Sequence, residues 1–189
     1  MPFHILRAPL LARTTLAVLA SLCSVAQAHI VLDQKSAPAG SYYKAVLRVG
    51  HGCDGAATTA ITVRMPPGVQ AAHPQPKPGW TLDIRRAAEG GEVSDITWRG
   101  GQLPDAWYDE FALQVKLPNT PGPLWFKVLQ QCGDTSTDWA EVPATGTVTR
   151  GLRRPAALLE VQPAAGAAAA MPDMPGMAAE PAAAHQHHH

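Results

Sequence analysis

The sequence lacks the features that would favour nucleic-acid binding or a membrane span. Its 15 Lys and Arg residues only balance 15 Asp and Glu residues, and nucleic-acid binding rests on a basic surplus. The apolar stretch at residues 14–25 is shorter than the roughly 20 residues that a transmembrane helix needs. A long helical periodicity is also missing. These absences exclude a nucleic-acid-binding protein and leave the apolar stretch to be explained in another way.

Residues 1–28 have the features of a secretory signal peptide. Arg7 and Arg13 precede the apolar stretch, and Ala26 and Ala28 supply the A-x-A cleavage pattern after it. We therefore expect cleavage after Ala28 and export to the periplasm. The mature chain is long enough for one domain with its own core.

Only three cysteines are present, and two of them, Cys53 and Cys132, follow the cleavage site. A disulfide is their natural state in an oxidising compartment. A bond between them would close a loop of 79 residues and stabilise the fold by roughly 4–5 kcal/mol. Copper ligation by two thiolates is the alternative, and it is weaker because the spacing does not fit C-x-x-C.

Apolar and polar residues alternate in short runs along the mature chain. Over residues 109–117, Phe111, Leu113 and Val115 share one face, and Gln114 lies on the other. Similar runs, most of them separated by Gly, Pro, Asn or Asp, predict strands at residues 29–34, 42–49, 59–65, 80–86, 93–98, 124–130, 139–142 and 158–161. This pattern predicts an all-β domain over residues 29–162, either an antiparallel sandwich or a barrel.

Residues 163–189 are rich in Ala, Pro, Met and His, and we predict that they form a disordered tail. Met171, Met174 and Met177 repeat every three residues in MPDMPGM. Thioethers prefer Cu(I), whereas imidazole also accepts Cu(II), so this tail could hold copper in either oxidation state. The alternatives are a simple linker for the methionines and part of a purification tag for the terminal histidines.

His29 would become the first residue of the mature chain. Its amine and its ring Nδ1 could then close one chelate ring on a metal with nitrogen donors that suit Cu(II). The alternative is a solvated chain terminus. His51, in the loop GHGCDG beside Cys53, could complete such a site, because a disulfide would hold its backbone.

Five tryptophans are many for a chain with three Phe and three Tyr. Most lie at strand positions, where core packing is the default. Trp139 is the exception of interest. It closely follows Cys132, so the disulfide would draw it toward the loop of His51.

The chain resembles the YcnI-like (also written YncI) copper-binding domain family, in the form seen in Gram-negative bacteria. Over residues 29–150 the resemblance is carried, in order, by AHIVLDQ, GSYYKAVLRVGHGCDGAATTAITVRMPPGV, KPGW, ITWRGGQLPD, DEFALQVKLPNT, LWFKVLQQCG and DWAEVP. It implies an immunoglobulin-like antiparallel β-sandwich. It also implies that His29 binds Cu(II) as a single-histidine brace and that a tryptophan, which corresponds to Trp139, lies close to the metal. Gram-positive members resemble the chain less in the first loop, where an acidic ligand is found. Here HGCDG offers His51 or Asp54 in its place.

We therefore expect a periplasmic copper chaperone or scavenger rather than an enzyme. Its partners would be copper ions and a periplasmic or membrane copper protein, and the mature chain would carry no membrane anchor. A histidine-brace copper oxygenase is one alternative, and it would need His51 as a second imidazole ligand. A cell-envelope interaction module that binds no metal is another.

Overall fold

The computed structural model describes residues 29–164, which form eleven β-strands and no helix. In chain order these are β1 (Val31–Leu32), β2 (Ser36–Pro38), β3 (Tyr42–Val49), β4 (Thr58–Arg64), β5 (Gln70–Pro74), β6 (Thr81–Arg86), β7 (Val93–Leu103), β8 (Asp109–Lys116), β9 (Gly122–Cys132), β10 (Thr135–Trp139) and β11 (Ala157–Gln162). No helix that could cross a membrane occurs among the described residues.

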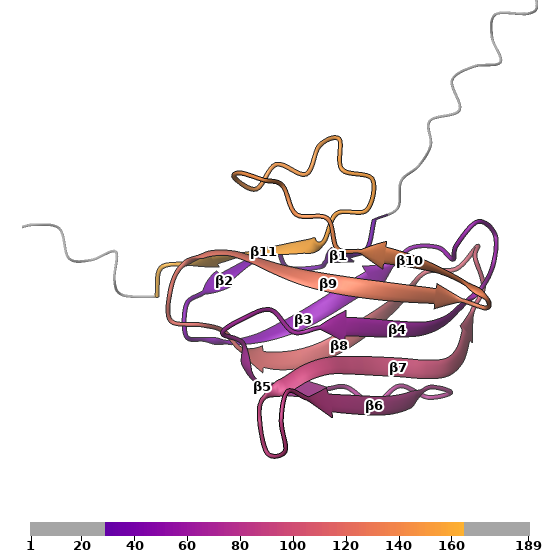
Figure 1. Ribbon diagram of the computed structural model, residues 1–189, viewed down its shortest axis with the longest axis horizontal. Helices are drawn as coiled ribbons and strands as arrows, with labels where there is room; N and C mark the ends of the chain where they lie inside the picture. The colour runs from indigo at the N-terminus through magenta and orange to yellow at the C-terminus, as the bar shows by residue number, and fades with distance from the viewer. Residues whose placement is uncertain (1–28, 165–189) are drawn as a thin grey trace, which may run out of the picture.

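The strands form two sheets that pack face to face (Figure 1). The four-stranded sheet has the order β1-β3-β8-β5. The seven-stranded sheet has the order β2-β11-β9-β4-β7-β6, and β10 pairs with β9 beside this path. Paired strands are antiparallel, except that β2 and β11 run parallel. The predicted antiparallel β-sandwich is therefore confirmed.

The core lies between the sheets and follows the alternation along the strands. On β8, Phe111, Leu113 and Val115 are buried. In the facing sheet, Phe126 and Val128 of β9 are buried as well. Because apolar burial is the main favourable contribution to folding, these inward rows hold the two sheets together.

The first described segment is well anchored although β1 has only two residues. Ile30 is buried, and the Asp33 N–H donates to a carbonyl oxygen of β3 at 3.0 Å. The Tyr43 hydroxyl donates to the Gln34 carbonyl oxygen at 2.6 Å. Burial of this phenol, with a smaller effect of the Asp33 carboxylate, raises the pKa of Tyr43 to about 12, so the hydroxyl remains a donor at neutral pH. The backbone next to His29 is thus held against the sandwich.

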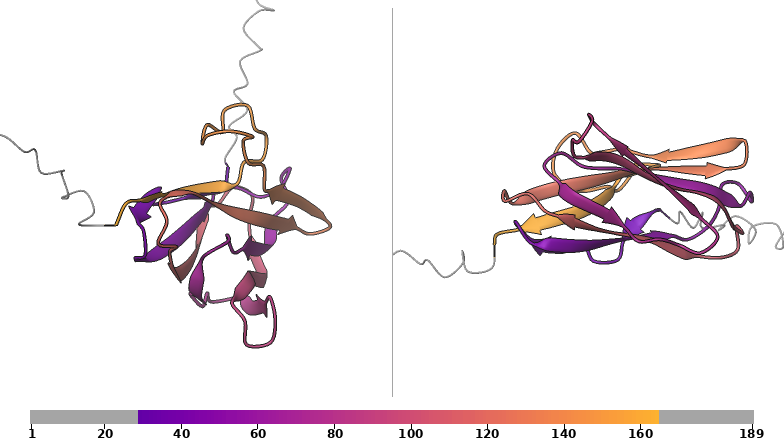
Figure 2. Two further views of the ribbon diagram at one scale, coloured as in Figure 1. Left: turned by 60° about the vertical axis from the view of Figure 1, so that its left-hand side comes forward. Right: turned by 90° about the horizontal axis from the view of Figure 1, so that it is seen from below.

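Two strands share one edge of β9. β11 pairs with residues 122–126 of β9, and β10 pairs with residues 128–132. Between them, residues 140–156 leave the sheet and stand clear of the sandwich (orange in Figure 1 and in the left view of Figure 2). Backbone hydrogen bonds from Glu141 to Arg154 (3.0 Å) and from Ala156 to Glu141 (2.8 Å) close the base of this excursion. The end of β10 and the start of β11 therefore lie close together.

The predicted strands agree best with the structure where the alternation is strongest. The strand predicted at 42–49 coincides with β3, whereas the one predicted at 29–34 shrinks to β1. The prediction of a strand at 139–142 is wrong, because Trp139 ends β10 instead of starting a strand. The sequence analysis missed β2 and β5. Both are short, and β5 contains Ala71 in a left-handed conformation (φ 48°), which interrupts the alternation.

The predicted disulfide between Cys53 and Cys132 is confirmed. Cys53 lies in the loop that connects β3 of one sheet to β4 of the other, and Cys132 ends β9, so the bond joins this connecting loop covalently to β9. Both residues are buried. Because the sulfur atoms bond to each other, the alternative of copper ligation by two thiolates does not apply to this pair.

Removing the disulfide should destabilise the sandwich. The double substitution Cys53→Ala and Cys132→Ala, which leaves no stray thiol, should lower the free energy of unfolding by about 2–5 kcal/mol. Urea denaturation followed by circular dichroism would measure the loss, and reduced wild-type protein should show a similar one. Equal stability of the variant and the oxidised wild type would contradict the structural role of the bond.

Candidate metal site at the start of the sandwich

His29 lies against the indole ring of Trp139. The ring centroids are 5.8 Å apart, and the planes meet at 62° in an edge-on arrangement. Trp139 ends β10 and is 7% exposed, so it forms a buried wall beside the half-buried His29. The two residues are far apart in the sequence and meet because β1 and β10 both lie at this side of the sandwich.

His29 also lines a groove of about 410 Å³ on this side of the molecule. Val31 of β1, Leu158 of β11 and Thr147 of the excursion line the same groove. His29 thus contacts Trp139 through its ring and forms part of the lining of this groove.

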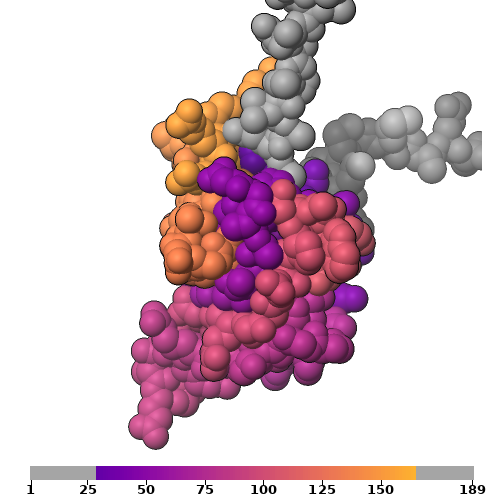
Figure 3. Space-filling model, turned by 90° about the vertical axis from the view of Figure 1, so that its right-hand side faces the viewer, coloured from indigo at the N-terminus to yellow at the C-terminus, as the bar shows by residue number. Residues whose placement is uncertain are grey.

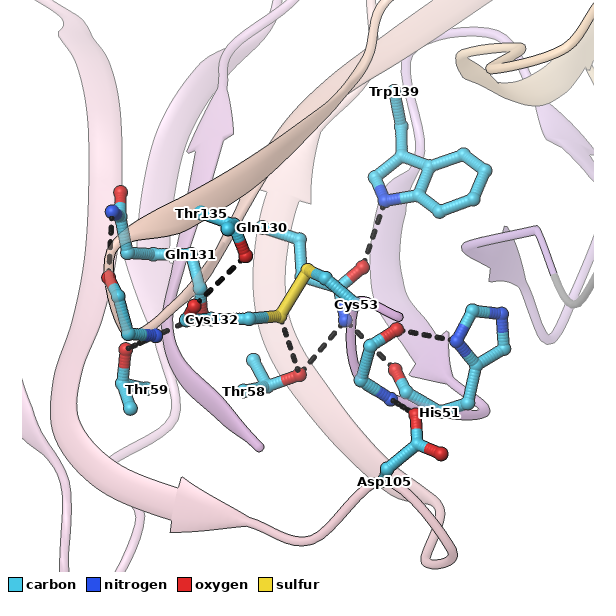
Figure 4. The surroundings of a disulfide bond; sticks show 12 residues. His51, Cys53, Thr58, Thr59, Asp105, Gln130, Gln131, Cys132, Thr135 and Trp139 are labelled. Atoms are coloured by element: carbon cyan, nitrogen blue, oxygen red, sulfur yellow. Dashed lines mark hydrogen bonds between the residues drawn. A yellow bond between two sulfur atoms is a disulfide. The ribbon is translucent and has the colours of Figure 1, made fainter. Parts of the chain in front are cut away.

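The buried side chain of Gln130 fixes the position of Trp139 by a hydrogen bond (Figure 4). Its indole Nε1 donates to Gln130 Oε1 at 2.9 Å. Gln130 Nε2 donates to the His51 carbonyl oxygen and to the Thr58 hydroxyl, both at 2.8 Å. Gln130 is 1% exposed and Thr58 is fully buried. One side-chain amide thus connects the wall beside His29 to the loop that carries His51.

The partners of Gln130 leave its amide only one orientation. The indole N–H of Trp139 can only donate, so it must face the amide oxygen, and the His51 carbonyl can only accept, so it must face the amide nitrogen. Thr58 Oγ1 lies 3.8 Å from Cys132 Sγ, which extends the network to the disulfide. Among the described residues, every buried side-chain nitrogen or oxygen has a hydrogen-bond partner.

A tight turn shapes the loop that carries His51. The backbone N–H of Cys53 donates to the Ala56 carbonyl at 3.0 Å, and that of Ala56 donates to the Cys53 carbonyl at 2.9 Å. Between them, Asp54 and Gly55 have φ values of 49° and 85°. Two successive left-handed residues are typical of a type I′ turn, for which Asp-Gly is favoured. The turn presents the Asp54 side chain to solvent.

His51 is half-buried, and its ring is oriented by the loop itself. Its Nδ1 donates to the Gly52 carbonyl oxygen, so Nε2 carries the lone pair. The Gly52 N–H donates to the Asp105 carboxylate at 2.9 Å. A Cβ atom at Gly52 would overlap the carbonyl oxygen of Ala56, so only glycine fits there.

The candidate ligands do not form a cluster of side chains. Across residues 29–164, no group of three or more His, Cys, Asp or Glu side chains could hold a metal ion. Extending the register of β1 and β3 by two residues brings His29 level with Gly50, the neighbour of His51. A metal site here would therefore need a donor outside the side chains. The α-amine that cleavage before His29 would expose fits this requirement, because it adds a second nitrogen donor from the same residue.

The sequence-based candidates differ in how the structure arranges them. Trp139 contacts His29 directly, and the backbone of His51 is linked to Trp139 through Gln130. Asp54 lies at the exposed tip of its turn. The three predicted tail ligands, Met171, Met174 and Met177, lie outside the described residues. Their roles as ligands stay predictions.

Sequence analysis missed Gln130 and Asp105, which organise this end of the sandwich. A signal for Gln130 exists, since it occupies the inward phase of its strand, after Phe126 and Val128. A polar residue at an inward position needs buried partners. Asp105 gave no comparable signal, because an aspartate in a loop is usually solvated.

The two packed sheets form an immunoglobulin-like β-sandwich. The chain belongs to the family described as a domain of unknown function, DUF1775, whose model matches residues 29–161. YcnI-like copper-binding domains belong to this family, in agreement with the resemblance seen in the sequence. The matched region begins at His29.

Solved structures that are similar to this chain include an uncharacterized immunoglobulin-like protein and a cohesin module. The crystal structure of an uncharacterized protein from Nocardia farcinica, with an immunoglobulin-like fold, has a TM-score of 0.59 and 28% sequence identity, and covers 70% of this chain and 97% of its own. A cohesin module from a Clostridium perfringens family 33 glycoside hydrolase has a TM-score of 0.43 and 13% identity, over 71% of this chain and 93% of its own. No curated protein matches the chain in sequence.

Gln130→Leu should destabilise the domain and displace Trp139. The substitution leaves the buried Trp139 N–H and the His51 carbonyl unpaired, and each such group costs about 1–3 kcal/mol. The matched control is Gln131→Leu, since Gln131 is half-buried and donates to the Gly133 carbonyl at an exposed turn. Chemical denaturation would measure both variants, and the indole N–H resonance of Trp139 would report its position. Equal losses in the two variants would contradict the special role of Gln130.

Proposed function

We propose that the mature chain is a copper carrier that binds Cu(II) through the amine and the ring Nδ1 of His29. The observation that carries this proposal is the packing of the His29 ring against Trp139, at the position where the expected cleavage would expose the amine. Membership in the family of the YcnI-like copper-binding domains supports it.

The environment of His29 suits a chelating terminus. Ile30 is buried directly after it, so the backbone at the chelate is held by the sandwich. Trp139 restricts the rotation of the imidazole on one side, and Gln130 in turn fixes Trp139. Ligands whose orientation is set before binding lose less freedom when the ion binds, and this strengthens the complex.

Further ligands would come from the loop of His51. The lone pair on Nε2 of His51 and the carboxylate of Asp54 are the two donors that this loop offers. The disulfide at Cys53 and the hydrogen bond from Gly52 to Asp105 anchor the loop, so either donor would approach the terminus from a stable backbone.

Two observations favour a carrier over a copper oxygenase. His29 lines an open groove, which suits an ion that must be taken up and released. An oxygenase brace would require the imidazole of His51 as a third nitrogen ligand, whereas a carrier could use either His51 Nε2 or the Asp54 carboxylate. Only the oxygenase therefore depends on a ring that its own loop already holds through Nδ1. Electron paramagnetic resonance of the Cu(II) form would count the bound nitrogens. Two nitrogens would leave Asp54 as the further ligand of a carrier. Three would show that His51 binds through Nε2, and turnover of ascorbate and peroxide by that form would favour the oxygenase.

Export fits this role. The buried disulfide is the kind of bond that forms outside the reducing cytosol. A periplasmic carrier would meet copper as both Cu(II) and Cu(I), and the methionine-rich tail would supply donors for the softer Cu(I) ion.

The first test of the proposal extends the terminus. One extra residue before His29 turns the amine into an amide, and Cu(II) affinity should fall more than about 100-fold, since even outer-shell changes cost 10–100-fold. Competition titrations should use a chain ending at Ala164, which removes the terminal histidines as competing ligands. His29→Ala should have a similar effect, with an unchanged free energy of unfolding as the control. Equal affinity of the extended and authentic chains would refute the brace.

The second test addresses the tail. Replacing Met171, Met174 and Met177 together with Leu should lower Cu(I) uptake by the mature chain and leave the Cu(II) spectrum of the His29 site unchanged. Leu keeps the size and hydrophobicity of Met, so the change isolates the thioether sulfur. Anaerobic titration with a Cu(I) chelator would measure the stoichiometry. The same Cu(I) stoichiometry in both proteins would show that the methionines are only a linker.

A further inference from the structure

Trp107 and Tyr108 are adjacent aromatic side chains that the fold leaves exposed. They are 65% and 62% exposed and lie in the loop 104–108 between β7 and β8. Most of the five tryptophans lie on strands, so core packing does not account for this pair. Single exposed apolar residues are ordinary on a protein surface, but Trp and Tyr together are typical of binding surfaces, where they contribute much of the affinity.

This aromatic pair lies at the end of the sandwich that carries His51. The Trp107 N–H donates to the Pro104 carbonyl at 3.0 Å, which closes a turn, and Asp105 accepts a hydrogen bond from the Gly52 N–H at 2.9 Å. Figure 3 views this end, where the purple loop 50–57 lies between the rose loop 104–108 and the orange turn between β9 and β10. The aromatic loop is therefore joined directly to the loop of the candidate copper site.

The same end of the sandwich carries unbalanced negative charge. Its three loops, 50–57, 104–108 and 133–134, contain Asp54, Asp105 and Asp134 but no Lys or Arg. None of the five ion pairs found among residues 29–164 involves these three aspartates. Carboxylates attract cations by charge, and the faces of Trp and Tyr attract them through the ring quadrupole. Both features therefore favour a partner with cationic side chains.

We propose that this end of the sandwich carries a docking surface for a protein partner that presents arginine and lysine side chains. The surface is formed by Trp107, Tyr108, Asp54 and Asp134. The tail of this chain is not the occupant, because residues 163–189 contain no Lys or Arg and add Asp173 and Glu180. An anionic membrane surface would be repelled. A partner docked here would lie beside the His51 loop and could receive copper over a short distance. Only this last step rests on the proposed function.

The test uses the metal-free mature chain, residues 29–189, labelled with nitrogen-15. An octapeptide of alternating arginine and glycine serves as the probe in an NMR titration. At low ionic strength, resonances of loops 50–57, 104–108 and 133–134 should shift, and high salt should weaken the effect. Two double variants should each lower the affinity about tenfold. Trp107→Ala with Tyr108→Ala loses the cation–π contacts, and Asp54→Asn with Asp134→Asn loses the ionic contacts. Tyr42→Ala is the matched control, since Tyr42 is 64% exposed at the opposite end of β3.

Three outcomes would overturn the docking surface. The shifts could be scattered over the whole molecule, or they could persist in the Trp107 and Tyr108 variant. In the third, these loops shift with protein concentration alone. The surface would then be a self-association interface, occupied by Arg150, Arg153 and Arg154 of a second copy, and not a docking surface for a different protein. Because the test contains no copper, its failure leaves the Cu(II) titration of His29 unaffected. Failure of that titration would likewise leave the docking surface standing.

Discussion

The hydrogen bonds of the Gln130 side chain are the constraint on which this end of the sandwich depends. A polar side chain at an inward strand position is tolerated only if each of its polar atoms finds a partner. Gln130 meets this requirement with groups from three other segments, namely β4, β10 and the loop after β3. Its partners must therefore take up one mutual arrangement. The Cys53–Cys132 disulfide reinforces that arrangement covalently, so the wall beside His29 and the His51 loop are positioned together.

The proposed site would be built around the chain terminus that cleavage before His29 creates. Most metal sites gather several side chains, and no such gathering exists within residues 29–164. A terminal histidine supplies two donors from one residue, so the fold needs only to hold the backbone that follows and to shape the surroundings of the ring. Buried Ile30 and the contact with Trp139 do this. Because the second donor would be an amine only after cleavage, a chain that keeps residues 1–28 would not form the proposed chelate.

The sequence predicted the strands in which apolar and polar residues alternate, and it did not predict the strands that lack this alternation. β3 was predicted at its observed bounds because four inward apolar residues alternate with outward ones that include Lys44 and Arg48. β10 has the sequence TSTDW, in which only the last residue is buried, so nothing in its pattern indicates a strand. The contact of His29 with Trp139 joins residues far apart in the chain, and only the family resemblance suggested it. The role of Gln130 required its partners in three segments to be known.

The excursion at residues 140–156 is closed at its base, so its length does not affect the geometry of the candidate site. β10 and β11 lie end to end along β9. Hydrogen bonds at Glu141 close the base of the excursion, so a change in its length would not move either strand. Doubling the length of a flexible loop costs only about 0.6 kcal/mol in closure entropy. Residues 144–146 are exposed at this excursion. A fluorescent label or affinity tag inserted there would leave the authentic first residue and the native tail intact, which tagging at either end would not allow.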